Sequence, residues 1–437
     1  MKKLKIIALL VMFTVTFLIS GCHNSDKKVI NNVVSFGGFC SIKDKLSGIS
    51  DPEEIYKIVQ SALDEGMSLD LTDMDLKISK PLVLFNQNIY GGSITYTGND
   101  GQPVIKLAGK CIIENVEIVN TCDNNECGEG KYVGIWLSNE KGTVESGSVI
   151  GSIFFRKCGT LIYAPSNVNS AACGLTIENL RAESWYFRGI DFQSSGCNNN
   201  SFSNLYICSA FAQASDAYKS DSAVADSAFY LKGCNNASIK QLNVEHCNLR
   251  RPIVFENCKD LDASTIHIEG MNIADDEMGY LNILNTSGRI GAVDFYWTRV
   301  YAKNNGAIVL GESSKDGDEL LIETFLVKGL HDPSAFDPGV KRGLINCGMK
   351  LIKRDQKYQN PYFVTINNYV PFTFQNDSQV LEEFYADKDN ITFKKIGQLP
   401  AGGPTSERPK QRLCKGYTEY FDTTLEKMVI WNGKTWE

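Results

Sequence analysis

The sequence lacks a surplus of positive charge. Its 437 residues carry 44 Lys and Arg against 51 Asp and Glu, a formal net charge of −7. Nucleic-acid binding requires clustered basic side chains that neutralise phosphates, so we expect no nucleic-acid partner. Histidine is scarce as well, with four residues, and no two cysteines form a Cys-x-x-Cys pair. The common pattern of a zinc site is therefore missing, and we expect no metal and no other cofactor.

Helical patterns are scarce in the body of the chain. Four cysteines, spaced 24, 37 and 24 residues apart, each precede a similar short strand by six or seven positions. A period of 24 residues is too short for a strand–helix–strand unit, and the segments between are rich in Val, Ile, Phe, Asn and Gly. Each repeat is therefore expected to be a coil of short strands, and the coils are expected to stack as a parallel β-solenoid. The four cysteines are Cys173, Cys197, Cys234 and Cys258.

The interval of 37 residues differs from the other two. It fits one coil of 24 residues with an insertion of 13, which we place in the Ala, Ser and Asp-rich stretch 209–227. Insertions in solenoids usually lie on the face that binds a partner. This stretch therefore marks the side of the solenoid where function is expected.

Superposing the repeats predicts two buried columns of apolar side chains. Each buried Leu or Ile contributes roughly 1.5 to 3 kcal/mol, and a register slip of one residue would turn both columns toward solvent. Polar residues at the bend before each strand form a ladder that can hydrogen-bond from coil to coil. The first column comprises Val116, Leu180, Leu205, Leu242 and Ile266; the second comprises Ile118, Ala182, Ile207, Val244 and Ile268; the ladder comprises Asn115, Asn179, Asn204, Gln241 and Thr265.

The two ends of the solenoid carry different signals. Asp51-Pro52-Glu53-Glu54, followed by an apolar stripe from Ile55 to Leu63, predicts a short helix that seals the open end. Alternating residues after Gly416 predict a small β-meander. We expect a lipoprotein signal peptide over 1–21, a tether over 22–48, the solenoid over 49–396, a linker over 397–411 and a C-terminal β tag over 412–437.

The first residues predict a lipid anchor. Three lysines precede an uncharged run from Ile6 to Ile19, and Ile19-Ser20-Gly21-Cys22 follows. The run has the length of a signal peptide, and small residues before a cysteine resemble the lipobox of bacterial lipoproteins. We therefore expect Cys22 to be acylated and the protein to be anchored in a bacterial cell envelope, at the outer membrane or the cell surface.

The remaining cysteines have two expected fates. Those in the solenoid recur at one point of the coil, as expected for small apolar side chains in a core corner, and we expect buried thiols there. Cys122 and Cys127 bracket a polar loop and are the expected local disulfide.

Two family resemblances follow from these features. The coiled body, with its opening helix and the strand Ile89-Tyr90-Gly91-Gly92, resembles the pectin-lyase-like right-handed parallel β-helix superfamily, particularly its tailspike and pectate-lyase-type branches, over about two thirds of the chain. The end of the chain resembles a short tag of phage tail-fibre proteins and related bacterial surface proteins, on Tyr420-Phe421-Asp422-Thr423-Thr424 and Trp431-Asn432-Gly433. The fold class implied is all-β: a right-handed parallel β-helix with a short N-terminal capping helix and a small C-terminal β-meander.

The resemblance to the superfamily implies a carbohydrate partner without a reaction type, since the superfamily contains lyases, hydrolases, esterases and inert adhesins. The paired-aspartate motif of polygalacturonases is missing, because Asp275-Asp276 lies in a different context, and so are the calcium-binding aspartates and catalytic arginine of pectate lyases. Whether the protein is an enzyme therefore stays open at this point, as does trimerisation through the tag.

Residues that alternate outward from the repeated strand predict two surface columns. Together they form a stripe of ionisable side chains beside the insertion. Solvated charges on the outer face of a solenoid are the alternative explanation for any single residue. One column comprises Glu117, Arg181, Tyr206, Asn243, His267 and Tyr301; the other comprises Val119, Glu183, Cys208, Glu245, Glu269 and Lys303.

The candidate catalytic residues come from this stripe. Glu245 and Glu269 should lie on adjacent coils at about 4.8 Å, so mutual repulsion favours one protonated carboxyl, as a general acid requires. Carboxyls about 5 to 5.5 Å apart suit a retaining glycosidase, and the wider pair of Glu183 and Glu245 suits inversion. His267 is a candidate for proton transfer.

The candidate substrate-binding residues lie beside these. Tyr206 could assist proton transfer, and Arg181 or Lys303 could hold a uronate or sulfate. Three residues just after one strand could stack on sugar rings at the edge of a lateral groove: Trp185, Tyr186 and Arg188.

Three functions remain open from the sequence. The first is an envelope-anchored protein that binds a polysaccharide and cleaves it as a glycoside hydrolase or a lyase. The second is a non-catalytic adhesin or phage-derived surface module, indicated by the terminal tag. The third is a purely structural envelope protein, for which no glycan should bind.

Overall fold

The structure is a computed structural model. It describes residues 35–36, 39–122, 127–208, 224–269, 272–273 and 279–296. Toward the C-terminus it describes 308–311, 319–328, 349–352, 363–370, 380–387, 390–395, 402–403, 405–407, 418–422, 424–431 and 435–437. The expected signal peptide and Cys22 lie outside these residues. Within them, no helix is long and apolar enough to cross a membrane.

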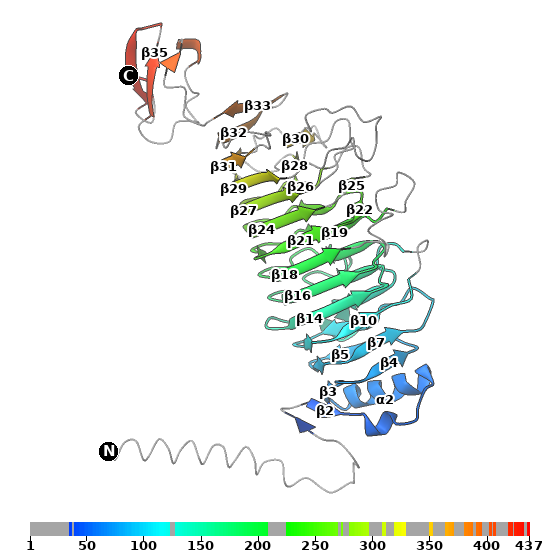
Figure 1. Ribbon diagram of the computed structural model, residues 1–437. Helices are drawn as coiled ribbons and strands as arrows, with labels where there is room; N and C mark the ends of the chain where they lie inside the picture. The colour runs from blue at the N-terminus through cyan, green and yellow to red at the C-terminus, as the bar shows by residue number, and fades with distance from the viewer. Residues whose placement is uncertain are drawn as a thin grey trace, which may run out of the picture.

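The predicted right-handed parallel β-helix is confirmed. Strands from successive coils stack along one axis (Figure 1) and form two extended sheets, a long sheet of 19 strands and a short sheet of ten. The long sheet contains β1 (Ser35–Phe36), β2 (Phe39–Ser41), β3 (Ser68–Asp70), β4 (Asp75–Ile78), β6 (Ile89–Tyr90), β7 (Ser93–Tyr96), β9 (Ile112–Glu114), β10 (Glu117–Val119), β14 (Val149–Arg156), β16 (Thr176–Glu183), β18 (Ser201–Cys208), β20 (Ser238–Ile239), β21 (Leu242–Glu245), β24 (Leu261–Glu269), β27 (Gly288–Tyr296), β29 (Glu319–Lys328), β31 (Phe363–Val370), β32 (Val380–Asp387) and β33 (Asn390–Lys395).

The short sheet forms another flank of the same coils. It contains β5 (Leu82–Phe85), β8 (Ile105–Ala108), β11 (Val133–Trp136), β15 (Thr160–Ala164), β17 (Arg188–Phe192), β19 (Ser227–Lys232), β23 (Ile253–Glu256), β26 (Leu281–Leu284), β28 (Ile308–Gly311) and β30 (Met349–Ile352). Two small pairs are β12 (Ser138–Asn139) with β13 (Gly142–Thr143), and β22 (Asn248–Leu249) with β25 (Asn272–Ile273).

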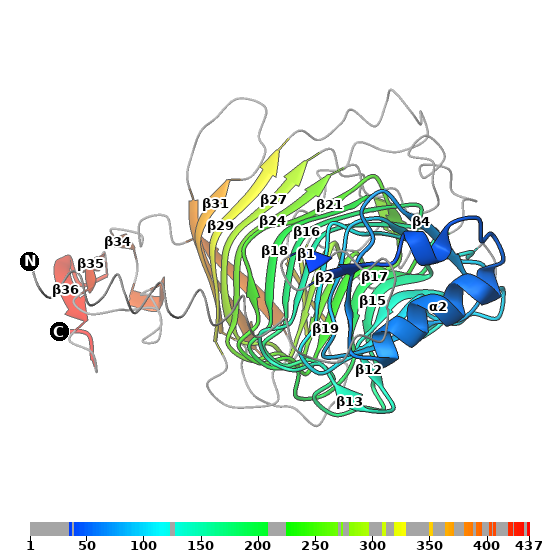
Figure 2. The same ribbon diagram turned by 90° about the horizontal axis from the view of Figure 1, so that it is seen from below.

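The predicted capping helix is confirmed as α2 (Pro52–Asp64), which follows a 3-10 turn at Asp44–Leu46. The Asp51 side chain accepts a hydrogen bond from the backbone N–H of Glu53 at 3.4 Å, and Pro52 opens the first turn. The apolar stripe of α2, including Val59 and Leu63, is buried over the first coils. Viewed from that end, the helix lies across the open cross-section (Figure 2), so it protects the apolar core of the first coils from solvent.

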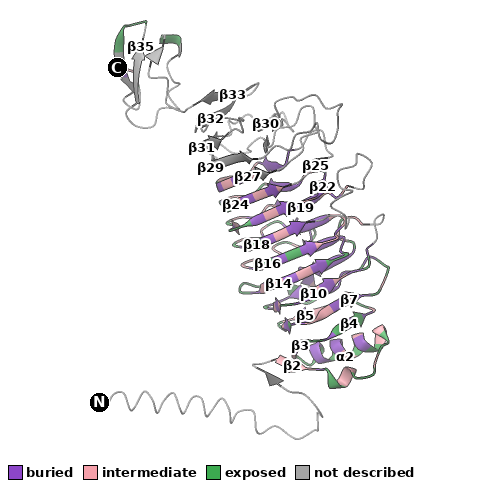
Figure 3. Cartoon of the chain, in the orientation of Figure 1, coloured by how far each residue is buried: buried purple, intermediate pink, exposed green. Residues whose placement is uncertain are grey.

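The predicted inward columns are confirmed in register. Leu180 pairs with Leu205, Leu205 with Leu242, and Leu242 with Ile266. All are buried, and the buried side chains follow the inner side of every coil (Figure 3). The prediction missed the coil of β14, which lies between β10 and β16 and adds Ile153 and Phe155 to the core.

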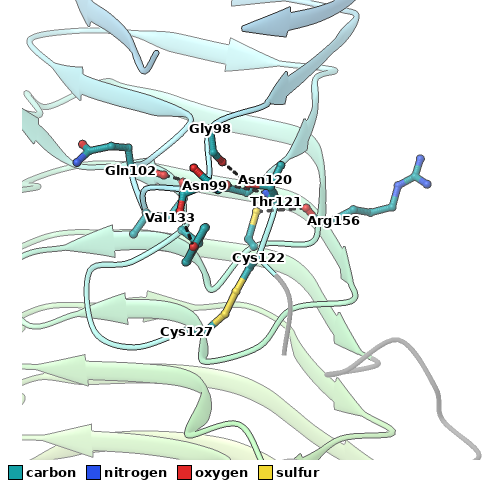
Figure 4. Close-up of a disulfide and its surroundings, with 11 residues drawn as sticks. Gly98, Asn99, Gln102, Asn120, Thr121, Cys122, Cys127, Val133 and Arg156 are labelled. Carbon is teal, nitrogen blue, oxygen red and sulfur yellow. Dashed lines mark hydrogen bonds between the residues drawn. A yellow bond between two sulfur atoms is a disulfide. The ribbon is translucent and has the colours of Figure 1, made fainter. Parts of the chain in front are cut away.

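The predicted disulfide between Cys122 and Cys127 is confirmed (Figure 4). The thiols of Cys197, Cys234 and Cys258 are free and fully buried, as expected for a core corner. The polar ladder is confirmed in part: the Asn204 side-chain amide donates to Asn179 Oδ1 at 2.8 Å. Both asparagines have φ near +50° (53° and 51°), a conformation that Asn tolerates better than most residues, which explains their place at the bend.

The sheets extend beyond the expected boundaries at both ends. Strand β2 pairs with β3, so part of the segment expected to be a tether belongs to the long sheet. Near the C-terminus, β34 (Gly402–Gly403) pairs with β35 (Thr418–Asp422), which forms a hairpin with β36 (Lys427–Trp431). The predicted small β tag is therefore present, and it includes residues expected to lie in the linker.

Candidate functional site

The outward face of the long sheet brings together the central part of the predicted stripe. Tyr206, Asn243 and His267 are successive partners in the register of β18, β21 and β24. In the neighbouring column, Cys208 pairs with Glu245 and Glu245 with Glu269. Residues far apart in the sequence are therefore direct neighbours, as the repeat spacing predicts.

The prediction is wrong for the next coil. Strand β27 continues both columns, and it places Asp294 opposite His267 and Tyr296 opposite Glu269. These are the positions that the sequence analysis gave to Tyr301 and Lys303, both of which lie outside the described residues. Lys303 is therefore not the neighbour of Glu269 in the register.

Four side chains form what we call the His267 cluster: Glu245, His267, Glu269 and Asp294. His267 Nε2 lies 3.3 Å from Glu269 Oε2 and 4.0 Å from Glu245 Oε1. Its other ring nitrogen, Nδ1, lies 3.5 Å from Asp294 Oδ2. The four side chains are between 16% and 24% exposed, so they are reachable from solvent and still well shielded.

The cluster holds more negative charge than its single histidine can offset. An ionised carboxylate only accepts hydrogen bonds, and a neutral imidazole carries one N–H. Both ring nitrogens of His267 face carboxylate oxygens. Both contacts are favourable only when the cluster holds a further cation, either a proton on His267 or on a carboxyl, or a metal ion. The geometry therefore favours a proton store or a cation site.

A divalent cation is chemically compatible with these groups. One ligand atom each from Glu245, His267 and Glu269 lie within 4.8 Å of one another, and imidazole with carboxylates suits several divalent metals. Asp294 at the opposite ring nitrogen is the kind of partner that commonly orients a metal-binding histidine. The expectation of no metal and no cofactor stays a prediction.

Tyr206 fixes one oxygen of Glu245. Its hydroxyl donates to Glu245 Oε2 at 2.8 Å. Burial, and then the hydrogen bond to Glu245, raise the pKa of Tyr206 well above its usual value. Tyr206 therefore remains a donor over the physiological pH range and stabilises the ionised form of Glu245.

Arg181 and Glu183 form a separate pair on the preceding coil. Arg181 Nη2 lies 2.8 Å from Glu183 Oε1. The guanidinium of Arg181 also lies over the Tyr206 ring, 5.7 Å from its centroid. Cys208 occupies the register position between this coil and Glu245, so Glu183 is not part of the His267 cluster.

Two of the three expected sugar-stacking residues are buried. Trp185 is fully buried, and its indole N–H donates to the carbonyl of Cys208 at 2.9 Å. Arg188 is also buried, 3.0 Å from Asp191 and paired with Asp226. The prediction that they contact a polysaccharide is wrong for both, because each serves contacts inside the protein. Tyr186 is half-buried.

Arg188 belongs to a charged network under the surface of the short sheet. Asp226 receives hydrogen bonds from both Arg188 and Arg251, and the Tyr230 ring lies between the two guanidinium groups and the core. Burial raises the pKa of Asp191 to about 6, although Arg188 opposes the rise. Burial acts in the same direction on Asp226, but Arg251 and Arg188 hold its pKa below the usual value.

The sequence analysis missed Asp294 and the Arg188 network. Asp294 could have been found, since Ile290 to Phe295 alternates like the other repeat strands once a longer interval is allowed after β24. The network has no such signal, because Asp191 and Asp226 lie in segments that share no repeated pattern. Which outward residues become covered depends on loops that a repeat alignment does not place.

Comparisons with known proteins give distant likenesses. No family model matches the chain, and no curated protein matches it. Among solved structures, ORF18 of Geobacillus virus E2 is similar with a TM-score of 0.36 and 12% identity, over 91% of this chain and 85% of that chain. The tailspike protein of Acinetobacter phage vB_ApiP_P1 has a TM-score of 0.34 and 10% identity, over 94% and 88%. The catalytic domain of Agl-KA has a TM-score of 0.27 and 12% identity, over 75% and 70%. These likenesses are too distant to identify a function, which is therefore argued from the residues themselves.

Proposed function

We propose that this protein binds a polysaccharide on the outer face of the long sheet and cleaves it by glycoside hydrolysis at the His267 cluster. The observation that carries the proposal is the pairing of Glu245 and Glu269 on adjacent coils with the imidazole of His267 against both. Two neighbouring carboxyl groups in different environments are the basic equipment of glycosidases.

Glu269 is the general acid in this proposal. It shares the extra proton of the cluster with His267, since the two groups lie 3.3 Å apart. In the first step the proton moves to the glycosidic oxygen as the bond between that oxygen and the anomeric carbon breaks. In the second step Glu269 takes a proton from water, which restores its starting state.

Glu245 is the nucleophile. The hydrogen bond from Tyr206 favours its ionised form, which a nucleophilic carboxylate needs. Its oxygen forms an ester bond to the anomeric carbon as the leaving sugar departs, and water then breaks that ester. The carboxylate oxygens of Glu245 and Glu269 lie within 4.8 Å, close to the separation of about 5 to 5.5 Å that is typical of retaining enzymes.

A lyase is the weaker form of the same proposal. β-Elimination from a uronate needs a cation at the sugar carboxylate as well as a base. The nearest described arginine, Arg181, is already paired with Glu183 on another coil. The base could be His267, so the elimination reaction remains an outcome that the experiment below distinguishes.

Non-catalytic glycan binding is the second candidate function. It is favoured by the fact that the charged groups of the His267 cluster and the Arg181–Glu183 pair already satisfy one another. A surface that is satisfied in this way can bind sugar hydroxyls without reacting. This candidate predicts binding without release of product.

We also propose that the chain is held in a bacterial envelope by a lipid on Cys22. The support is the run of apolar residues before Ser20-Gly21-Cys22. A lipid anchor would keep the β-helix at a surface where envelope or environmental polysaccharides are available.

One experiment separates these functions. The chain from Ser35 onward would be incubated with a panel of polysaccharides, while reducing ends and the ultraviolet absorbance of unsaturated products are followed together. Hydrolysis gives reducing ends without absorbance, elimination gives both, and a binder gives neither while retaining affinity in a pull-down. Absence of binding and of products across the panel would overturn the proposal.

The role of a metal is tested on the same reaction. We expect activity to survive prolonged dialysis against a chelator, because the proposed mechanism needs a proton in the cluster and no metal. Loss of activity that manganese or zinc restores would instead assign Glu245, His267 and Glu269 as metal ligands and remove them from acid–base catalysis.

A further inference from the structure

A pocket of about 330 Å³ lies on the short sheet, away from the His267 cluster. Its floor comes from β8 and β11, and its rim comes from the turn between β7 and β8 and from β12. Its volume is at the lower end of the range of about 300 to 1,000 Å³ for small-molecule sites. The lining residues are Gly101, Gln102, Pro103, Lys106, Gly130, Trp136, Ser138, Asn139 and Glu140.

Trp136 is held in a fixed orientation in this pocket. Its indole N–H donates to Ser138 Oγ at 2.9 Å. The ring also makes an edge contact with Tyr163, with centroids 4.8 Å apart and planes at 77°. The Tyr163 hydroxyl in turn donates to Glu129 Oε1 at 3.1 Å. The indole is half-buried and preset before any ligand arrives, so a ligand need not bear the entropic cost of ordering it.

The polar rim of the pocket is equally ordered. The Asn139 side-chain amide donates to the carbonyl of Leu84 at 2.8 Å, and its oxygen accepts from the backbone N–H of Lys141 at 2.8 Å. The carbonyl of Gln102 accepts a hydrogen bond from Asn120 at 3.2 Å (Figure 4). These contacts fix the walls around Trp136.

Lys106 supplies a positive charge beside the indole. It is the direct register partner of Trp136, with β8 and β11 adjacent in the short sheet. In the part of the chain that the structure describes, no carboxylate lies within 4 Å of the Lys106 ammonium, although the protein as a whole is acidic. A half-buried lysine without a carboxylate partner favours an anionic ligand.

We propose that this pocket binds a single anionic sugar unit, with the ring stacked on Trp136 and its carboxylate or sulfate against Lys106. A flat aromatic surface, fixed amides and one free cation together recognise a ring with hydroxyls and a negative group. The glycan class of the ligand rests on the proposed function, whereas the location and the preference for charge rest on Lys106 and Trp136. The pocket would hold an acidic polysaccharide at a second point, apart from the position where it is cleaved.

The test is a titration of the described β-helix chain with glucuronate, glucose 6-sulfate, glucose and acetate, followed by calorimetry. We expect the two anionic sugars to bind at least about tenfold more tightly than glucose, and acetate not to compete. Lys106→Met should remove the preference for the anionic sugars, and Trp136→Phe should weaken all sugars. Lys77→Met, an exposed lysine on β4, is the matched control and should change nothing.

Equal affinity for glucose and glucuronate, or an unchanged preference in Lys106→Met, would overturn the inference. Competition by acetate at similar concentration would show a simple anion site and would also overturn it. Glu269→Gln separates this inference from the proposed function, since it should abolish cleavage and leave the titration unchanged. Cleavage without sugar binding here would reject this pocket alone.

Discussion

Glu245 and Glu269 are direct partners across the adjacent parallel strands β21 and β24. Like charges at directly paired positions in a sheet are normally destabilising. Here His267 lies between them and the Tyr206 hydroxyl engages the outer oxygen of Glu245. The sheet therefore holds an unfavourable pair in place through neighbouring groups, as is common where a chemical function is selected at the expense of stability.

Removing the Tyr206 hydroxyl should weaken catalysis without unfolding the protein. In Tyr206→Phe, Glu245 loses a charge-assisted hydrogen bond worth about 1.5 to 3 kcal/mol, so we expect kcat to fall about tenfold to a hundredfold. The melting temperature should change little, because the ring and its contact with Arg181 remain. Tyr90→Phe, at an exposed tyrosine, is the control. A variant with unchanged kcat would show that Tyr206 does not act on Glu245.

Asp191 should make the stability of the fold depend on pH. Its folded-state pKa of about 6 lies above its usual value of 3.8, so the folded state binds the proton more tightly. Its stabilising contribution is complete below pH 3.8 and is lost as the pH rises through about 6. We expect the unfolding free energy of the wild type, relative to Asp191→Asn, to fall across this window, with a slope of at most about 1.4 kcal/mol per pH unit.

Chemical denaturation of both proteins at several pH values measures this difference. The comparison cancels groups that titrate equally in both chains, such as Glu53, whose pKa is lowered to about 2 by hydrogen bonds from Ser79 and Lys80. A difference that is constant between pH 4 and 6 would contradict the assignment to Asp191.

The stacked core should be sensitive to a single cavity. Ile266 is fully buried between Leu242 and Val293 of the neighbouring coils. Ile266→Ala should lower the unfolding free energy by about 2 to 5 kcal/mol. Ser264→Ala, at an exposed position of the same strand, should change it by less than about 0.5 kcal/mol. Equal effects of the two substitutions would be inconsistent with the inward column.

The lipid anchor gives a prediction outside the described residues. Replacing Cys22 with serine should move the full-length protein from the membrane fraction to the soluble fraction of the producing cells. Mass spectrometry of the wild type should find acyl chains on Cys22. Cys40→Ser, within β2, is the control and should stay in the membrane fraction. A soluble wild-type protein without acyl chains would reject the anchor.

The sequence predicts the fold better than it predicts the site. The spacing of Leu205, Leu242 and Ile266 is enough to align three coils, because a solenoid converts equal sequence intervals into direct neighbours. The same logic brings Glu245, His267 and Glu269 together without any structural information. It works wherever the coil length is constant.

Prediction fails where the coil length changes or where a side chain is covered by another coil. The coil between β24 and β27 is longer than the repeat, so Asp294 rather than Tyr301 continues the column. Trp185 has the sequence context of a surface aromatic residue, yet its indole N–H is used by Cys208 of the next coil. Burial of this kind depends on tertiary contacts that a repeated pattern does not record.

The most direct measurement is the turnover of Glu269→Gln on whichever polysaccharide the wild type cleaves, with Asp262→Asn, an exposed acid on the same strand, beside it. The account predicts that Glu269→Gln lowers kcat about a hundredfold to ten-thousandfold, with unchanged affinity for the polysaccharide and an unchanged melting temperature, and that Asp262→Asn retains full activity. Wild-type turnover in Glu269→Gln would contradict the assignment of the His267 cluster as the catalytic centre.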